Sequence, residues 1–453
     1  MSLLFNPGKT LRLSVVFLIM ISLFLITPLS PISADTDSIF TPYQKYILEN
    51  GLTVIIKEVH SSPIVAIDIQ VGTGAKNESI NNAGISHFLE HMLFKGTERR
   101  KVGEIAKEIT AVGGRLNGAT SLDTTHYYVT LPSKYVDLAL DIEADAIMNS
   151  TFDPEEIERE RLVVLEEIRR RDDNNQSIMY SLGFNKLFAG TPYANDVLGT
   201  ADTLQNINRD VFLDYYHKYY VPNNMAIAIV GDIDPDKTLA QIKLLFKDFK
   251  PNKIQPAPTF EIPKLTEITR FEIQKDVHQT YMCFGFPVPA LSFSDRAALS
   301  VLTVLLGDSE NSRLFKLYGK RLIRSIRAGF FNFQDGGLVG IYIETENKAS
   351  VLERKVQPIL KDLIADGVSD DELTIAKTLL KTRYAFRAEN DYLLANIMSY
   401  SEVTGSVTDA IEFEQSIDKV TKEDIQRIAK EYLNPNGYIL ISLNTGEDNK
   451  NEK

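Results

Sequence analysis

Two stretches of the chain repeat the same order of hydrophobic and polar positions. Residues 207–220 have the apolar spacing of an amphipathic helix and lead through Val-Pro-Asn-Asn into an apolar strand at 225–230. Residues 421–432 have the same helical spacing and lead through Leu-Asn-Pro-Asn into a strand at 438–442. This repeat predicts two related halves of roughly 200 residues each.

Further patterns in the first half predict a sheet and a long helix. Residues 52–57, 64–71 and 128–131 are rich in β-branched and aromatic residues, as strands are. Asp153 is a suitable N-cap for a helix that starts at Pro154 and runs to Arg171. We therefore predict an α+β fold, in which two homologous half-domains each carry a mixed sheet with helices packed on one face.

Prolines divide the two halves. Residues 249–264, FKPNKIQPAPTFEIPK, have no regular periodicity and predict a linker. The expected organisation is an N-terminal domain at 35–248, a C-terminal homologous domain at 265–446 and a polar tail at 447–453.

The N-terminus has the layout of a secretory signal peptide. Lys9 and Arg12 precede an apolar run at residues 13–26, which is shorter than the roughly 20 residues of a membrane span. Small residues then offer a cleavage site before Asp35. We expect residues 1–34 to be a signal peptide and the protein to be exported, periplasmic or extracellular. An uncleaved membrane anchor is the alternative.

Composition and charge exclude some classes of function. The 453 residues are 44% hydrophobic and 24% charged, which is ordinary for globular domains. The net charge of −12 argues against a nucleic-acid-binding surface. The single cysteine, Cys283, excludes a disulfide within the chain and a structural zinc site of the cysteine type, and we expect it to be buried.

One short motif carries candidate metal chemistry. In His87-Phe88-Leu89-Glu90-His91, a helix of 3.6 residues per turn places His91 about 40° around from His87 and one turn further on. Both imidazoles can therefore reach one zinc ion, with Glu90 beside them. Two core histidines with an unrelated glutamate are the alternative, although the chain has only six histidines.

A third ligand would come from another element, because catalytic zinc usually has three protein ligands and a water. The predicted helix IERERLVVLEEIRR offers Glu160 and Glu167 on one face, seven residues apart. Glu158 and Glu166 point elsewhere and are expected to be solvated.

The motifs GISHFLEHMLFKGT, GGRLNGATSLDTTHYY and ERERLVVLEEI together resemble the pitrilysin and mitochondrial-processing-peptidase family of zinc metallopeptidases, the inverzincins. The resemblance covers nearly all of the chain after the N-terminal segment. It implies that His87, His91 and Glu167 bind zinc, that Glu90 is the catalytic base activating a zinc-bound water, and that Glu160 supports the zinc ligands without binding the metal itself.

The same resemblance implies a fold and a substrate. The two halves are expected to close like a clamshell over a chamber, and the activity to be that of a zinc-dependent endopeptidase (a hydrolase) acting on peptides or unfolded segments. The substrate is expected to pair with a sheet edge at Asn117, Gly118, Ala119 and Thr120. Gly118 departs from the family's usual alanine, and an ordinary turn into a strand is the alternative interpretation.

One family feature is missing. Active members carry an arginine and a tyrosine that hold the substrate, in a stretch resembling residues 311–327 here, where neither residue falls at the matching position. We therefore expect a heterodimer in which a related subunit supplies the pair, with a homodimer or a misalignment as alternatives. A non-catalytic scaffold or assembly subunit and a metal-storage or sensor protein are the competing functions.

Overall fold

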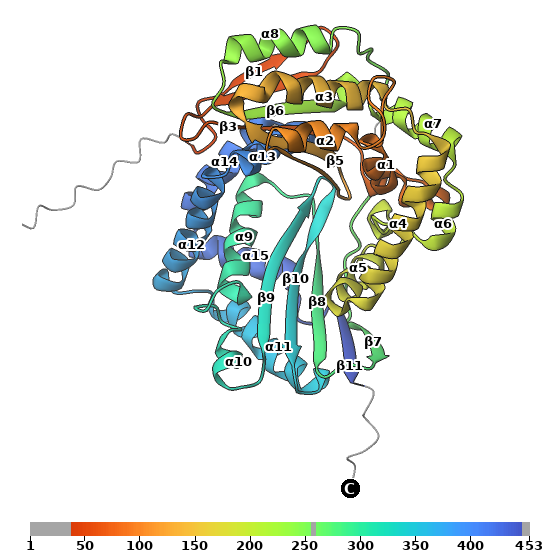
Figure 1. Ribbon diagram of the computed structural model, residues 1–453. Helices are drawn as coiled ribbons and strands as arrows, with labels where there is room; N and C mark the ends of the chain where they lie inside the picture. Colours follow the sequence, from red (N-terminus) through yellow and green to blue (C-terminus); the bar gives the residue numbers. More distant parts are fainter. Residues whose placement is uncertain (1–37, 255–259, 446–453) are drawn as a thin grey trace, which may run out of the picture. The chain divides into compact units, whose positions relative to one another are not determined.

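The computed structural model describes residues 38–254 and 260–445, whose strands form two sheets (Figure 1). The first sheet contains β1 (Gln44–Ile47), β2 (Thr53–Glu58), β3 (Ile64–Val71), β4 (Arg115–Thr120), β5 (Thr125–Pro132) and β6 (Met225–Gly231). The second contains β7 (Thr269–Lys275), β8 (Thr280–Pro289), β9 (Ser325–Phe333), β10 (Gly336–Thr345) and β11 (Ile439–Thr445). Every described strand before the predicted linker lies in the first sheet, and every one after it lies in the second.

The two sheets have the same topology. The first has the order β1-β2-β6-β3-β5-β4 and the second β7-β11-β8-β10-β9. Without the additional edge strand β1, both follow the order first, fifth, second, fourth, third along the chain. In both, the first and fifth strands are parallel and the other neighbours are antiparallel. This identity of topology confirms the predicted α+β fold of two homologous halves.

Helices connect the strands in matching places. The first half has α1 (Ile85–Leu93), α2 (Glu104–Ala111), α3 (Val136–Asn149), α4 (Pro154–Asp173), α5 (Asn175–Leu187), α6 (Ala201–Gln205), α7 (Arg209–Tyr219) and α8 (Pro235–Leu245). The second half has α9 (Phe293–Gly307), α10 (Lys316–Gly319), α11 (Ala349–Asp366), α12 (Asp370–Ala388), α13 (Asp391–Thr404), α14 (Val407–Lys419) and α15 (Lys422–Tyr432). The predicted helices at 154–171, 207–220 and 421–432 are α4, α7 and α15. The Asp153 side chain caps α4 by accepting the backbone N–H groups of Glu155 and Glu156.

The first sheet is covered on both faces, which the sequence did not predict. One face packs on the helices of its own half, in a core that includes Ile67 and Ile229. The other face carries Ala66 and Val230, which pack with Met398 of helix α13. Figure 1 shows this helix of the second half lying beside β3 and β6. The signal for it is in strand β3, where seven successive residues are buried although one-sided strands alternate.

A buried ion-pair network also joins the halves. Lys76 of the first half lies 2.8 Å from Asp123 and 3.1 Å from Asp335, which stands in the turn between β9 and β10. The Lys76 side chain is 6% exposed and that of Asp123 is 1% exposed. Removing one member of such a network leaves buried charge without compensation, so the network fixes this turn on the first half.

Several predictions concern particular segments. Residues 1–34, 255–259 of the linker and 447–453 of the tail lie outside the described residues, so the signal peptide and the domain boundaries stay predictions. Cys283 is buried with a free thiol, as expected, and burial raises the pKa of this thiol to about 12. Within residues 38–254 and 260–445, no helix is long and apolar enough to cross a membrane.

Glu143 of α3 is a buried carboxyl group without compensation. It is 0% exposed, and neither carboxyl oxygen has a hydrogen-bond partner among the described residues. Burial, and secondarily the charge of Asp68, raise its pKa from 4.5 to about 8. The folded state therefore holds a proton that the unfolded state releases, and this group lowers stability as pH rises from 4.5 to about 8.

Substituting Glu143→Met should remove this penalty. We expect the variant to gain stability relative to the parent, with a gain that grows as pH rises from 4.5 and levels off above about 8. Urea unfolding at several pH values measures it. The exposed Glu98→Met variant serves as the control, and parallel pH curves for Glu143→Met and the parent protein would contradict the prediction.

Candidate metal centre

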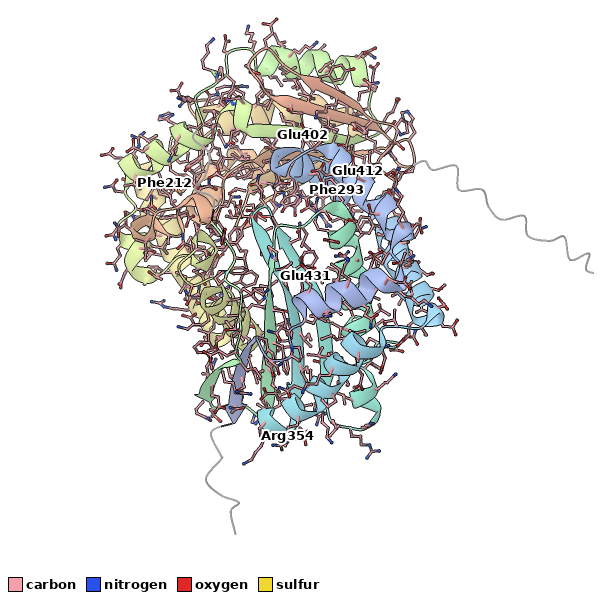
Figure 2. All side chains as sticks on the ribbon, turned by 180° about the vertical axis from the view of Figure 1, so that it is seen from behind. Phe212, Phe293, Arg354, Glu402, Glu412 and Glu431 are labelled. Atoms are coloured by element: carbon pink, nitrogen blue, oxygen red, sulfur yellow. The ribbon has the colours of Figure 1, made fainter. Side chains whose placement is uncertain are left out.

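Helix α1 carries both motif histidines on one side and packs its other side into the hydrophobic core. Phe88, Leu89 and Met92 are at most 1% exposed. The ring of Phe88 meets that of Phe212 edge to face at 4.8 Å, and Figure 2 labels Phe212 on α7. The His87 and His91 side chains point away from this core and are 12% and 17% exposed. Burial of the apolar face therefore fixes the direction in which both imidazoles project.

The start of α1 is held by Glu78, which sequence reasoning missed. Its carboxylate oxygens accept the backbone N–H groups of Gly84 and Ser86 at 2.7 and 2.8 Å. Burial raises the pKa of Glu78 to about 8, while these two hydrogen bonds oppose the rise. Gly84 has φ +95°, and a Cβ there would lie 2.7 Å from the Leu198 carbonyl oxygen. Only glycine fits this sharp entry into the helix.

Three side chains converge on the side of α1 that faces away from the core. Glu167 of α4 places one oxygen, Oε2, 3.5 Å from His87 Nε2 and 3.6 Å from His91 Nε2. The two imidazole rings have centroids 4.7 Å apart. The ligand atoms of the three residues all lie within 4.8 Å of one another. The structure thus brings together the three residues predicted as zinc ligands.

The geometry of these atoms fits zinc. A tetrahedral ion with bonds of about 2.0–2.1 Å to nitrogen and oxygen separates its ligand atoms by roughly 3.4 Å. The distances of 3.5 and 3.6 Å from the Glu167 oxygen to the two Nε2 atoms agree with this spacing. Two imidazoles and one carboxylate also leave a fourth position for water, which is the donor set of catalytic rather than structural zinc sites.

The surroundings of His87 favour its neutral imidazole, which is the form that binds metal. Burial, and secondarily the neighbouring His91, lower the pKa of His87 to about 3. His91 has a second partner, since its Nδ1 lies 3.2 Å from Glu160 Oε2, and Lys95 Nζ lies 2.5 Å from the other oxygen of Glu160. Glu160 therefore contacts His91, and Lys95 contacts Glu160 in turn. His87 Nδ1 is buried and has no partner among the described residues.

Glu90 is a separate carboxylate close to this cluster. Burial raises its pKa above the ordinary value, and the hydrogen bond from Thr120 opposes the rise. The Thr120 hydroxyl donates to Glu90 Oε2 at 2.8 Å. Glu90 is therefore held in place by Thr120 and is not one of the three converging ligands, and its role as a base stays a prediction.

The predicted substrate-binding residues lie on β4, the edge strand of the first sheet. Gly118 and Thr120 face α1, whereas Asn117 and Ala119 are exposed on the alternate positions. A Cβ at Gly118 would lie 2.8 Å from Cγ of Glu90. The glycine that departs from the family pattern therefore makes room for the Glu90 side chain in this protein.

Comparison with known proteins agrees with the fold. Residues 53–201 match the family described as insulinase (peptidase family M16), and residues 206–380 match the peptidase M16 inactive domain. The chain is 32% identical over 344 residues to the zinc protease YmxG of Bacillus subtilis, covering 75% of this chain and 82% of that protein.

Solved structures give the same result. A protease from Helicobacter pylori superposes with a TM-score of 0.84 at 26% identity, covering 89% of this chain and 99% of that one. The periplasmic protease PqqL of Escherichia coli has a TM-score of 0.75 at 22% identity, covering 89% of this chain and 47% of PqqL, and supports the fold. The chain belongs to the insulinase family of peptidases, peptidase family M16.

Proposed function

We propose that this protein is a zinc-dependent endopeptidase that hydrolyses peptides or unfolded segments. His87, His91 and Glu167 hold the zinc, Glu90 is the general base and Glu160 orients His91. The observation that carries the proposal is the convergence of two Nε2 atoms and one carboxylate oxygen at 3.5 and 3.6 Å, beside a buried carboxylate and a sheet edge. Relatives named zinc proteases support it.

The chemistry follows from these positions. Bound zinc would supply a Lewis acid that polarises a carbonyl oxygen and makes water more acidic. Glu90 takes a proton from the attacking water and later gives it to the nitrogen of the leaving amine. Its raised pKa makes the carboxylate a better proton acceptor than a solvated glutamate.

Substrate capture is assigned to β4. An edge strand offers unpaired backbone groups to an extended peptide, which can add to the sheet as a further strand. Residues 117–120 lie next to Glu90 through the contacts of Gly118 and Thr120. A peptide bonded there would carry its backbone past the metal ligands.

Cellular location is part of the proposal. The charged and apolar order of residues 1–34 supports export, and a structural relative is described as a periplasmic protease. A non-catalytic scaffold is the competing function. The intact set of His87, His91, Glu167 and Glu90 argues against it, because a scaffold has no need of converging metal ligands.

Zinc binding tests the ligand assignment. Glu167→Gln should weaken zinc binding by more than the roughly 10- to 100-fold loss typical for an outer-shell partner, because a charged ligand is removed. Zinc content after dialysis against a competing chelator measures this. Glu166→Gln, on the same helix but half-exposed, is the matched control and should keep its zinc. Equal zinc content in both variants would contradict the assignment.

The general base has its own test. Glu90→Gln should retain zinc and lose at least about 10²-fold in turnover of an unstructured peptide, because the amide cannot accept the proton. Peptide cleavage and zinc content are measured on the same preparation. Cleavage at the parent rate with zinc present would show that Glu90 is not the base.

We also propose that a related subunit completes the site. Residues 311–327 include α10 and the start of β9, and Arg313 and Arg324 in this stretch are paired with Glu372 and Glu346. These ion pairs leave both arginines occupied within their own half.

The isolated chain should therefore turn over slowly. A missing donor to the developing oxyanion typically costs about 10²–10³ in rate. We expect weak cleavage of an unstructured peptide by the zinc-loaded chain alone and strong cleavage after a related co-expressed subunit is added. The same mixture with Glu90→Gln is the control. Strong cleavage by the purified single chain would argue that no second subunit is needed.

A further inference from the structure

The second half has a cavity of about 620 Å³. Its walls come from α9, the edge strand β9, α12, α13 and α14. Helix α9 packs against both β9 and α12, and Figure 1 shows these elements together. The volume lies within the roughly 300–1,000 Å³ of ordinary ligand pockets.

This cavity occupies the topological position of the candidate metal centre. Helix α9 follows the second strand of its sheet, as α1 does in the first half. Strand β9 is the third strand and lies at the sheet edge, as β4 does. Helix α12 is the second helix after the fourth strand and packs on α9, as α4 packs on α1. The two halves thus place different side chains on the same scaffold.

The charged side chains in the cavity are arginines and aspartates. Arg296, Arg383 and Arg387 line it with Asp308 and Asp409. Arg383 is taken up by an ion pair with Asp308. Neither Arg296 nor Arg387 forms an ion pair with any of the residues described. The cavity therefore holds two guanidinium groups that are outside any ion pair among the described residues.

Arg296 is the most constrained of these groups. Its Nε is buried without a hydrogen-bond partner among the described residues. Its guanidinium lies 4.2 Å from the ring centroid of Phe293, which Figure 2 labels at the start of α9. Burial lowers the pKa of Arg296, and the charge of Asp409 only partly offsets this. A buried N–H donor without an acceptor costs free energy, so an acceptor bound beside Arg296 would remove this cost.

The remaining lining of the cavity indicates which kind of molecule could carry the hydrogen-bond acceptor. Aromatic rings line the cavity beside the arginines: Phe330, Phe333, Tyr384, Tyr400 and Phe413. Guanidinium groups pair with carboxylates through two parallel hydrogen bonds. An anion with an apolar or aromatic body matches both kinds of wall.

We propose that this cavity binds a carboxylate attached to an aromatic or apolar body, either a free organic acid or the C-terminal residue of a peptide, with Arg296 as the principal anchor. The site lies in the second half, away from His87, His91 and Glu167, so the proposal is independent of the proposed peptidase activity. Asn396 lines the cavity and also donates to Asp68 of β3 at 3.3 Å, which places the site directly behind the first sheet.

Calorimetric titration of the zinc-loaded full chain tests the proposal. The probes are N-acetylphenylalanine, its neutral amide and inorganic phosphate. We expect saturable binding of the acid, and at least about tenfold weaker binding of the amide and of phosphate. The tripeptide acetyl-Ala-Ala-Phe, with a free or an amidated C-terminus, separates the two sources. Tighter binding of the free-acid tripeptide than of N-acetylphenylalanine assigns a peptide terminus, and the reverse order assigns a free acid.

Variants locate the binding. Arg296→Gln should weaken binding of the acid by about tenfold or more. Arg296→Lys should give an intermediate loss of affinity, because lysine keeps the positive charge but not the two parallel N–H donors of the guanidinium. Arg387→Gln, at an exposed position, keeps the test valid if Arg296→Gln does not fold. Arg354→Gln on α11, far from Phe293 in Figure 2, is the matched control and should bind as the parent does. Absent binding, equal binding of acid and amide, or folded Arg296 and Arg387 variants with unchanged affinity would overturn the proposal.

Discussion

Burial of helix α1 against the first sheet is the constraint on which the candidate metal centre depends. A helical spacing of four places two imidazoles on one side of any helix, but it does not fix where they point in the molecule. Phe88, Leu89 and Met92 fix this by filling the core. Helix α4 is seated in the same core through Val164 and Ile168, so Glu167, on the adjoining side of its helix, reaches the imidazoles. The close approach of ligand atoms is thus a consequence of apolar packing.

The predictable parts of this protein are the local ones. The cap at Asp153, the strands at 64–71 and 225–230 and the pairing of His87 with His91 follow from periodicity and turn chemistry. The choice of Glu167 needed the family resemblance, because Glu160 lies on the same face. Contacts across long stretches of sequence had no such signal. Glu78 at the start of α1 and the cover of α13 on β3 depend on the assembled fold.

Duplication explains how one fold carries two chemistries. The halves share strand order and direction, so each provides a helix after the second strand and an exposed edge strand at the third. In the first half this place holds imidazole and carboxylate groups. In the second it holds arginines and aromatic rings around a cavity. Function follows the side chains at a site rather than the fold that presents them.

The two halves nevertheless form one physical unit around the first sheet. Asp68 of β3 is 0% exposed, and its carboxylate accepts from Ser399 at 2.6 Å and pairs with His126 Nδ1 at 2.7 Å. His126 stands opposite Ala119 in the register of β5 and β4. Without α13, this aspartate and the apolar residues beside it would face water, and the strand that supports the edge would lose one packed face. The second half therefore stabilises the surface on which the first half would hold its substrate.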